Sequence, residues 1–425
     1  MSEMTETGTD YRRLTLEVVT PTMIGSGDKM TKIEYLVDEE IGKIYVLNQG
    51  NWHRFLMTRD DLFDAYKKSV GEKTPDLFLN ELKNIIGQPM NSVRMRLKPQ
   101  RIEDCIILRE ISTGQKPTVN VKHSSGNKSA NSKVGKKVSF NELATHVATP
   151  EGKVYIPGSS IKGAVRTALL WSVLKRCPDA AEKVATALLT KERKGEGGKT
   201  IRIKPSDAAS KLESLIWDEI LKQGDIQDSK YVMSGISISD AMPVGNPETV
   251  VLKKLDYSAR ESKFGKALGA AEGSVKELPL YRECIVPGTT FSFSMEVDAT
   301  KTAVLGIRTV DDVLKVLQGF FEFIQSQMPN DFKRTQVDIG AGVKQGGMYL
   351  GAGTGFLTKT LVMSLVAASG RAKGEGVEFI RRLLSETKPA NHKHGSIPTL
   401  ISPRTLKLTE YKGKKQEFGI VRVYE

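Results

Sequence analysis

Apolar and polar residues alternate near the N-terminus of the chain. Leu14, Leu16 and Val18 are separated by Thr15 and Glu17, and this period of two predicts a strand that buries one face. A second alternating segment lies far downstream, in TTFSFSMEVD, where every second residue is apolar. We therefore expect both segments to pack one face against a core.

Further strands are predicted from short apolar runs that are bounded by turn residues. The segment TKIEYLVDEEIGKIYVLN predicts a hairpin that turns near Glu40 and Gly42. Strand patterns recur in the second half of the chain, in SGISISDAMPV, ETVVLKKLDY, LYRECIVPG and, close to the C-terminus, EFGIVRVY. We expect these segments to build a sheet-rich second half.

Amphipathic spacing predicts helices over residues 161–176, 179–189 and 207–223. The segments DDLFDAYKKSV, PDLFLNELKNII and DDVLKVLQGFFEFIQSQM predict further helices. Because strands with interposed helices recur in both halves, the pattern favours an α+β fold over a doubly wound sheet. A length of 425 residues suits two or three domains. We expect an N-terminal domain over residues 1–240 and a C-terminal domain over residues 241–425.

One segment, GAGVKQGGMYLGAGTGFLTKT (Gly340 to Thr360), is unusually rich in glycine. Glycine raises the entropic cost of ordering a loop, so a tight turn, a close backbone contact or a phosphate contact should compensate. The glycine spacing does not match the G-x-G-x-x-G dinucleotide fingerprint, and no long helical pattern follows. The nearest imitation of a P-loop, KGEGGKT, lacks the required first glycine. We therefore expect no nucleotide cofactor.

A second distinctive segment is VYIPGSSIKGAVRTALLWSVLKRC. Its Pro-Gly pair predicts a turn, and Ser159 or Ser160 is the expected N-cap of the helix that follows. Lys162 and Arg166 share one helix face near the positive end of the helix dipole, where cations are unfavourable. Free amides, hydroxyls and two cations together would bind phosphate. The alternative is a surface helix whose charges face water.

The formal net charge is +13 and the calculated isoelectric point is about 9.4. Such a charge favours a polyanionic partner such as nucleic acid. The segment from Ser112 to Ser139 adds six lysines and no acidic residue, which is typical of a solvated loop and is compatible with ordering on an RNA strand.

Three widely spaced cysteines argue against a disulfide framework and a zinc site. No segment has the apolar length of a membrane span, and the first residues lack the pattern of a signal peptide. We expect a soluble, cytoplasmic protein. Signatures of catalysis are sparse, and the pair His392 and His394 lacks an evident third metal ligand.

The chain resembles the RAMP superfamily of CRISPR-associated proteins in five ordered motifs: TPTMIGSGD, IPGSSIKGAVRTAL, ISISDAMPV, PLYRECIVPGTTFSFSMEV and MYLGAGTGFLTKT. The resemblance runs from about Tyr11 to Phe356 and beyond. The order of the motifs is most similar to the fifth Csm subunit of type III-A CRISPR effector complexes.

This resemblance implies ferredoxin-like (RRM-like) RAMP modules with helical insertions and basic loops. It implies a non-catalytic, RNA-binding subunit that caps the 3′ end of the guide RNA (crRNA) in antiviral defence. The implied partners are crRNA, the backbone RAMP subunit and the small helical subunit. A role in crRNA 3′-end maturation, through recruitment of host nucleases, is also implied. No cofactor and no metal are implied.

The motif match assigns RNA contacts to glycines, serines and cations of the two distinctive segments. These candidate residues are Gly158, Ser159, Ser160, Lys162, Arg166, Lys344, Gly351, Gly353, Gly355 and Lys359. Among the aromatic residues near the glycines, Tyr349 and Phe356 fit a core role better than base stacking.

Two residues bear on catalysis. Backbone RAMP subunits that cut RNA carry an aspartate in a loop after the first strand, but Asp38 is about one residue out of register with it. We therefore do not assign Asp38 a cleavage role. The alternative function is a metal-independent endoribonuclease that processes precursor crRNA, with His53 as the candidate acid–base residue.

Overall fold

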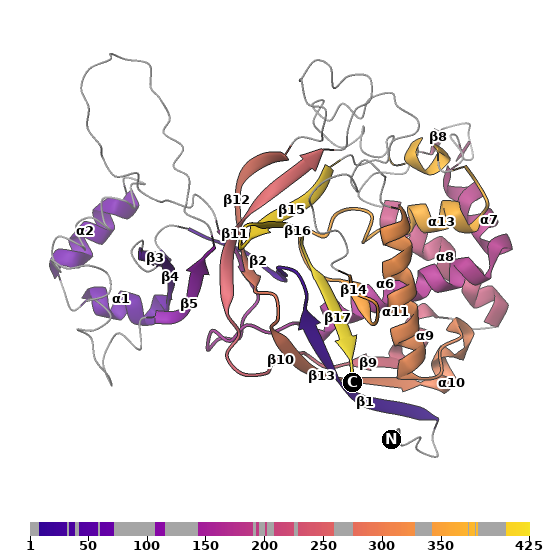
Figure 1. The fold of residues 1–425 in the computed structure, drawn as a ribbon, viewed down its shortest axis with the longest axis horizontal. Helices are drawn as coiled ribbons and strands as arrows, with labels where there is room; N and C mark the ends of the chain where they lie inside the picture. The colour runs from indigo at the N-terminus through magenta and orange to yellow at the C-terminus, as the bar shows by residue number, and fades with distance from the viewer. Residues whose placement is uncertain are drawn as a thin grey trace, which may run out of the picture.

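The N-terminal alternating segment lies at the centre of a sheet in the computed structural model of the chain (Figure 1). The structure describes residues 8–31, 34–38, 42–57, 60–71, 107–114, 143–189, 193–194, 200–201, 208–224, 228–258, 275–327, 342–372, 374–378, 380 and 405–425. Within these ranges, two large sheets and one two-stranded sheet combine with a layer of helices. The predicted α+β class is confirmed.

The first sheet has the strand order β10-β13-β1-β17-β14, and β9 also pairs with β13. Its strands are β1 (Thr9–Val18), β9 (Ile236–Ile238), β10 (Met242–Pro243), β13 (Thr290–Asp298), β14 (Gly347–Tyr349) and β17 (Ile420–Tyr424). The predicted alternation is confirmed, because Leu14, Leu16 and Val18 of β1 are buried while the residues between them are partly exposed. Every neighbouring pair in this sheet is antiparallel.

The first sheet has the connectivity of a ferredoxin-like module. Strand β1 is followed by helix α6 (Gly158–Arg176), then by β9, β10 and β13, then by helix α11 (Val310–Gln327), and finally by β17. The two strands that precede the helices, β1 and β13, lie side by side in the middle of the sheet. The RRM-like fold implied by the sequence motifs is therefore confirmed.

The second sheet has the order β2-β6-β12-β11-β5-β4-β3, with β15 on β11 and β16 on β15. Its strands are β2 (Gly25–Met30), β3 (Tyr35–Asp38), β4 (Lys43–Leu47), β5 (Ile107–Thr113), β6 (Leu143–His146), β11 (Thr249–Ser258), β12 (Val275–Ile285), β15 (Thr405–Tyr411) and β16 (Lys414–Glu417). Strands β3 and β4 form the predicted hairpin. A separate pair joins β7 (Arg193–Lys194) to β8 (Thr200–Ile201).

Both large sheets combine strands from either side of residue 240. In the first sheet β1 pairs with β13 and β17, and in the second β6 pairs with β12 and β5 pairs with β11. The division into residues 1–240 and 241–425 stays a prediction.

The remaining helices are α1 (Gln49–Met57), α2 (Asp60–Gly71), α7 (Pro178–Leu189), α8 (Ala208–Gly224), α9 (Ser229–Ser234), α10 (Ala299–Thr302), a short 3-10 turn (Ala303–Leu305) and α13 (Val362–Ala368). The helices predicted near residues 161–176, 179–189 and 207–223 are confirmed. The predicted helix in PDLFLNELKNII lies outside the described residues. Figure 1 places α1 and α2 beside β3–β5, far from the layer that holds α6, α8 and α11.

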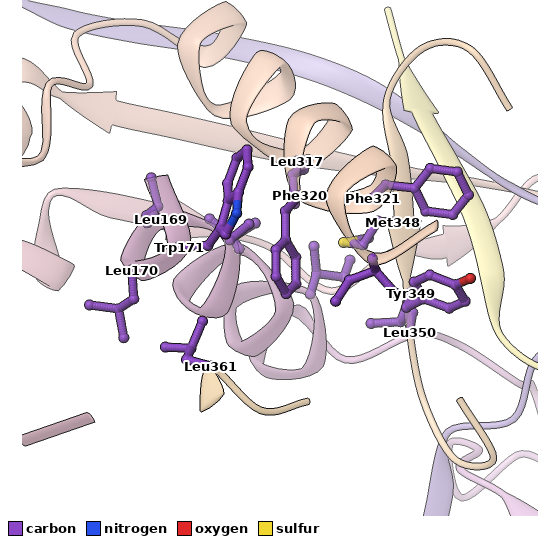
Figure 2. Close-up of a cluster of buried hydrophobic side chains, with 14 of the residues drawn as sticks. Leu169, Leu170, Trp171, Leu317, Phe320, Phe321, Met348, Tyr349, Leu350 and Leu361 are labelled. Atoms are coloured by element: carbon purple, nitrogen blue, oxygen red, sulfur yellow. The ribbon is translucent and has the colours of Figure 1, made fainter. Parts of the chain in front are cut away.

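The main core lies between the first sheet and helices α6 and α11 (Figure 2). Trp171 of α6 packs against Phe320 and Phe323 of α11, with ring centroids 5.8 Å apart in both pairs. Leu361 packs into the same core as Leu170 of α6. The end of the glycine-rich segment is thereby attached to the helical layer.

A buried ion pair crosses the second sheet. The guanidinium of Arg109 on β5 donates to both carboxylate oxygens of the fully buried Glu283 on β12, and the Nη2–Oε2 distance is 2.8 Å. The backbone N–H of His146 donates to the same carboxylate at 2.9 Å. Burial, together with the nearby charge of Arg109, lowers the pKa of the His146 imidazole to about 4, although the hydrogen bond to the Val147 carbonyl opposes both effects. His146 is therefore neutral in the folded chain at neutral pH.

Candidate nucleic-acid interface

Helix α6 begins against the segment that joins β9 to β10. The backbone N–H of Gly158 donates to Oδ1 of Asp240 at 2.7 Å. A Cβ atom at Gly158 would lie inside van der Waals distance of the Ile238 carbonyl and 2.7 Å from the Ser239 carbonyl oxygen. Glycine is needed at this position because the start of α6 packs directly against the backbone of Ile238 and Ser239 in the same chain.

The predicted serine N-cap is wrong. The residue before the helix is Pro157, and no side chain of the adjacent serines makes a cap hydrogen bond. Ser159 is exposed and Ser160 is partly buried. Asp240 supplies the acceptor instead, so the start of α6 already carries a negative charge that offsets the positive end of the helix dipole. Fewer backbone N–H groups at the start of α6 are therefore free to bind phosphate than the sequence predicted, because the Gly158 N–H already has an acceptor.

The two cations of α6 have different environments. Lys162 is partly buried, which lowers the pKa of its ammonium, and no acceptor among the described residues contacts it. Arg166, by contrast, forms an ion pair through Nε with Glu213 of α8. The Arg166 side chain is 43% exposed. The expectation that both cations face a ligand freely is corrected for Arg166.

The glycine-rich segment, from Gly342 to Thr360 in the described residues, is termed the glycine ribbon below. Gly351 has φ +86°, and a Cβ atom there would lie 2.8 Å from Cδ1 of Ile24 and 3.0 Å from the carbonyl carbon of Met23. The next residue, Ala352, donates its N–H to the Met23 carbonyl at 2.7 Å. The ribbon is thus held against the TPTMIGSGD segment.

The next two glycines have different surroundings from each other. Gly353 has φ +89°, and a Cβ atom there would lie 2.6 Å from Nη1 of Arg282 and 2.9 Å from the ring of Phe418. Gly355 has φ +93°, but no described atom lies within 4 Å of the position its Cβ would take. Gly355 therefore borders open space, whereas Gly353 accommodates neighbours within the chain.

The core role expected for the two aromatic residues is confirmed. Tyr349 is buried and its hydroxyl donates to Oε2 of Glu417 at 3.2 Å. Burial, together with the charge of Glu417, raises the pKa of Tyr349 well above its usual value. Phe356 is partly buried and packs against the main core. Neither ring is placed as a platform for base stacking.

Two lysines of the glycine ribbon reach the surface. Lys344 is exposed and contacts no acceptor among the described residues. Lys359 is also exposed, but protein atoms around its ammonium lower its pKa, and the charge of Arg282 lowers it further. Arg282 was not among the residues predicted from the sequence. It lies on β12, and its Nη1 is close to Gly353 of the ribbon.

The candidate catalytic residues lie apart from the ribbon. His53 is exposed on α1, and its Nε2 lies 3.3 Å from the Tyr66 hydroxyl of α2. Asp38 ends β3 and pairs with Lys43 in a regular hairpin, so it does not occupy a loop. Residues His392 and His394, and most of the basic segment 112–139, lie outside the described residues.

Among the residues that the structure describes, no group of three or more potential metal ligands comes together. No helix in the same part of the chain is both long and apolar enough to cross a membrane.

The model of the RAMP superfamily matches residues 15–355, which is more than half of the chain. The chain therefore belongs to the RAMP superfamily. The match extends from β1 through α6 into the glycine ribbon, and so includes both distinctive segments.

Within the superfamily, the chain is similar to proteins named "CRISPR system Cms protein Csm5". The protein from Streptococcus thermophilus is 27% identical over 358 residues, which cover 83% of this chain and 81% of that protein. The protein from Enterococcus italicus is 23% identical over 363 residues, which cover 81% and 78%. One chain of a solved "Csm-crRNA-target RNA ternary complex in type III-A CRISPR-Cas system" has the same fold, with a TM-score of 0.58, 18% identity, and coverage of 97% of this chain and 100% of that chain.

Proposed function

We propose that the chain is a Csm5-type subunit of a type III-A CRISPR complex that binds the 3′ part of crRNA and does not cut it. Membership of the RAMP superfamily and similarity to the Csm5 proteins support this role. The observation that carries the RNA-binding proposal is a set of cations without carboxylate partners among the described residues. These cations are Lys162, Lys344, Lys359 and Arg282.

Unpaired cations are costly to retain when they serve only the fold. A partly buried cation loses hydration, and nearby cations repel one another. A phosphate backbone removes both costs, because it supplies anions at regular spacing and releases condensed counterions when Lys and Arg contact it. The net charge of +13 also favours a polyanionic partner for the chain as a whole.

The proposed partners are crRNA, the backbone RAMP subunit and the small helical subunit. Maturation of the crRNA 3′ end would then be carried out by recruited nucleases. Photocrosslinking tests the position of the subunit on the guide. A guide with 4-thiouridine at its 3′-terminal positions should crosslink to this chain in the assembled complex, whereas crosslinking only from 5′-terminal positions contradicts the capping role.

RNA binding itself is tested by Lys162→Ala in the full chain, measured by fluorescence anisotropy with a labelled single-stranded RNA across a KCl series. We expect affinity to fall by about tenfold, as for loss of one charged hydrogen bond, and the salt slope to fall by about 0.7. Arg166→Ala should have a smaller effect, because Glu213 already engages Arg166.

The matched control is Lys222→Ala, which removes a surface lysine that is paired with Glu219 of the same helix at 3.0 Å. Its affinity and salt slope should equal those of the parent. An unchanged slope in Lys162→Ala refutes the contact. Incubation of the parent with repeat RNA in EDTA distinguishes the endoribonuclease alternative, because site-specific cleavage that is lost in His53→Ala would contradict the non-catalytic role.

A further inference from the structure

Arg282 presents a polar atom that the described structure leaves unsatisfied. Its Nη1 is buried and has no hydrogen-bond partner among the described residues. The guanidinium stacks over the ring of Phe418, with Cζ 5.4 Å from the ring centroid. Gly353 allows the ribbon to approach Nη1 closely, because any Cβ there would collide with it.

Lys254 and Lys359 lie near this guanidinium, and Lys254 shares its carboxylate partner with Lys407. Oδ1 of Asp256 lies 3.3 Å from Nζ of Lys254 and 2.8 Å from Nζ of Lys407. Burial lowers the pKa of both Lys254 and Lys359, and the charge of Arg282 lowers both further. The charge of Lys407 also lowers the pKa of Lys254, whereas Asp256 raises it. Lys254 and Lys407 therefore share one carboxylate, whereas Arg282 and Lys359 form no ion pair with a described carboxylate.

This arrangement is incomplete as a structural ion-pair network. A guanidinium that leaves water should gain a carboxylate and several hydrogen bonds, as Arg109 does with Glu283 in the same sheet. Arg282 has an aromatic ring and a backbone neighbour instead, and the one nearby carboxylate is occupied by two lysines. The missing component is an anion with several acceptor oxygens, which a phosphate supplies.

We propose that Arg282, Lys254 and Lys359 hold one phosphate group of the RNA strand beside the glycine ribbon. This inference rests on the proposed function, since the phosphate is an internal phosphodiester of the bound strand. Gly355 suits this role because no described atom lies within 4 Å of the position its Cβ would take. The second sheet thus contributes to RNA binding from β11 and β12, together with the ribbon of the first.

The first test measures RNA affinity in variants that keep the shape of the site. Arg282→Met preserves the aliphatic stem over Phe418, and Lys359→Ala changes an exposed residue. We expect at least a tenfold loss of affinity for Arg282→Met and a threefold or greater loss for Lys359→Ala. Asp256→Asn should bind RNA more tightly, a gain that misfolding cannot produce. Lys222→Ala again serves as the control with parental affinity.

The second test locates the phosphate. A set of labelled RNA strands, each with one uncharged methylphosphonate linkage, is titrated against the parent and against Arg282→Met. The parent should lose affinity most at one linkage, and the same linkage should cause no further loss in Arg282→Met, because the contact is already absent. Equal losses in both proteins at every linkage would overturn the proposal.

The outcomes separate the two levels of the hypothesis. A parent chain that does not bind RNA refutes the proposed function and this inference together. A parent that binds RNA, with unchanged affinity in Arg282→Met, Lys359→Ala and Asp256→Asn, refutes this inference alone. Loss of the Arg282→Met subunit from the assembled complex with unchanged RNA affinity would show that a protein carboxylate meets Arg282, and would also overturn it.

Discussion

Gly351 and Gly355 form a matched pair for testing what the glycine ribbon does. Both have φ near +90°, in the region that side-chain-bearing residues rarely adopt. They differ in what a Cβ atom would meet. At Gly351 it would collide with the Met23 carbonyl and approach Ile24, whereas at Gly355 it would meet no described atom. Alanine at each position therefore separates backbone strain from steric conflict.

Backbone strain should be similar in the two variants. An L-residue in left-handed conformation costs about 1–2 kcal/mol, of which about 0.4–1 kcal/mol is recovered because alanine restricts the unfolded chain. Gly355→Ala should thus lose about 1 kcal/mol of unfolding free energy. Gly351→Ala must also displace the Met23 backbone, which Ala352 holds at 2.7 Å, and overpacking adds about 1–3 kcal/mol. Its loss should be about 2–4 kcal/mol.

The assay is urea-induced unfolding followed by tryptophan fluorescence, which reports on Trp52 and on Trp171 and Trp217 of the main core. The midpoint should fall further for Gly351→Ala than for Gly355→Ala, with an unchanged slope in both. Equal midpoints would refute the reasoning, because they would mean that the contact with Met23 yields without cost and that only backbone conformation matters.

Two further predictions concern buried polar groups. Because the pKa of His146 is lowered from 6.5 to about 4, the unfolded chain binds more protons at acid pH, and stability should fall as the pH drops from 6.5 towards 4. The expected loss between pH 7 and pH 5 is about 2 kcal/mol in urea titrations, and a slope that persists in His146→Gln would contradict the assignment. Asp240→Ala leaves the Gly158 N–H without its acceptor and should lower stability by about 1–3 kcal/mol. Asp240→Asn keeps an acceptor and should lose about 0.3–1 kcal/mol, and equal thermal shifts for the two variants would argue against the charge effect.

Periodicity predicted the elements of the fold but not their neighbours. The alternation in β1 shows which face is buried, and it predicted the strand correctly. It carries no information that β1 pairs on one side with β17, a strand from the opposite end of the chain. Strand pairing depends on long-range contacts, which a local pattern does not contain. The division of the chain at residue 240 came from local patterns alone and stays a prediction.

The candidate site shows the same limit at the level of single residues. The serine N-cap is a sound local prediction, but Asp240 reaches the helix start from a distant segment and displaces it. Arg166 follows a helical spacing that brings it to the surface, yet Glu213 of α8 meets it there. Arg282 was not predicted, because the strand pattern shows only that it lies on β12. The pattern carries no information that the glycine ribbon lies close to that strand.

The glycines connect these observations. Gly351 is close to Met23, in the segment between β1 and β2, and Gly353 is close to Arg282 of β12, so the glycine ribbon, which includes β14 of the first sheet, contacts the second sheet at Gly353. Larger residues would force the ribbon away from β12 and would separate Lys359 from Arg282. The glycine content therefore serves two purposes through one geometry. It allows the contact between the ribbon and β12, and that contact brings Lys359 close to Arg282, and these are two of the cations that we propose hold one phosphate.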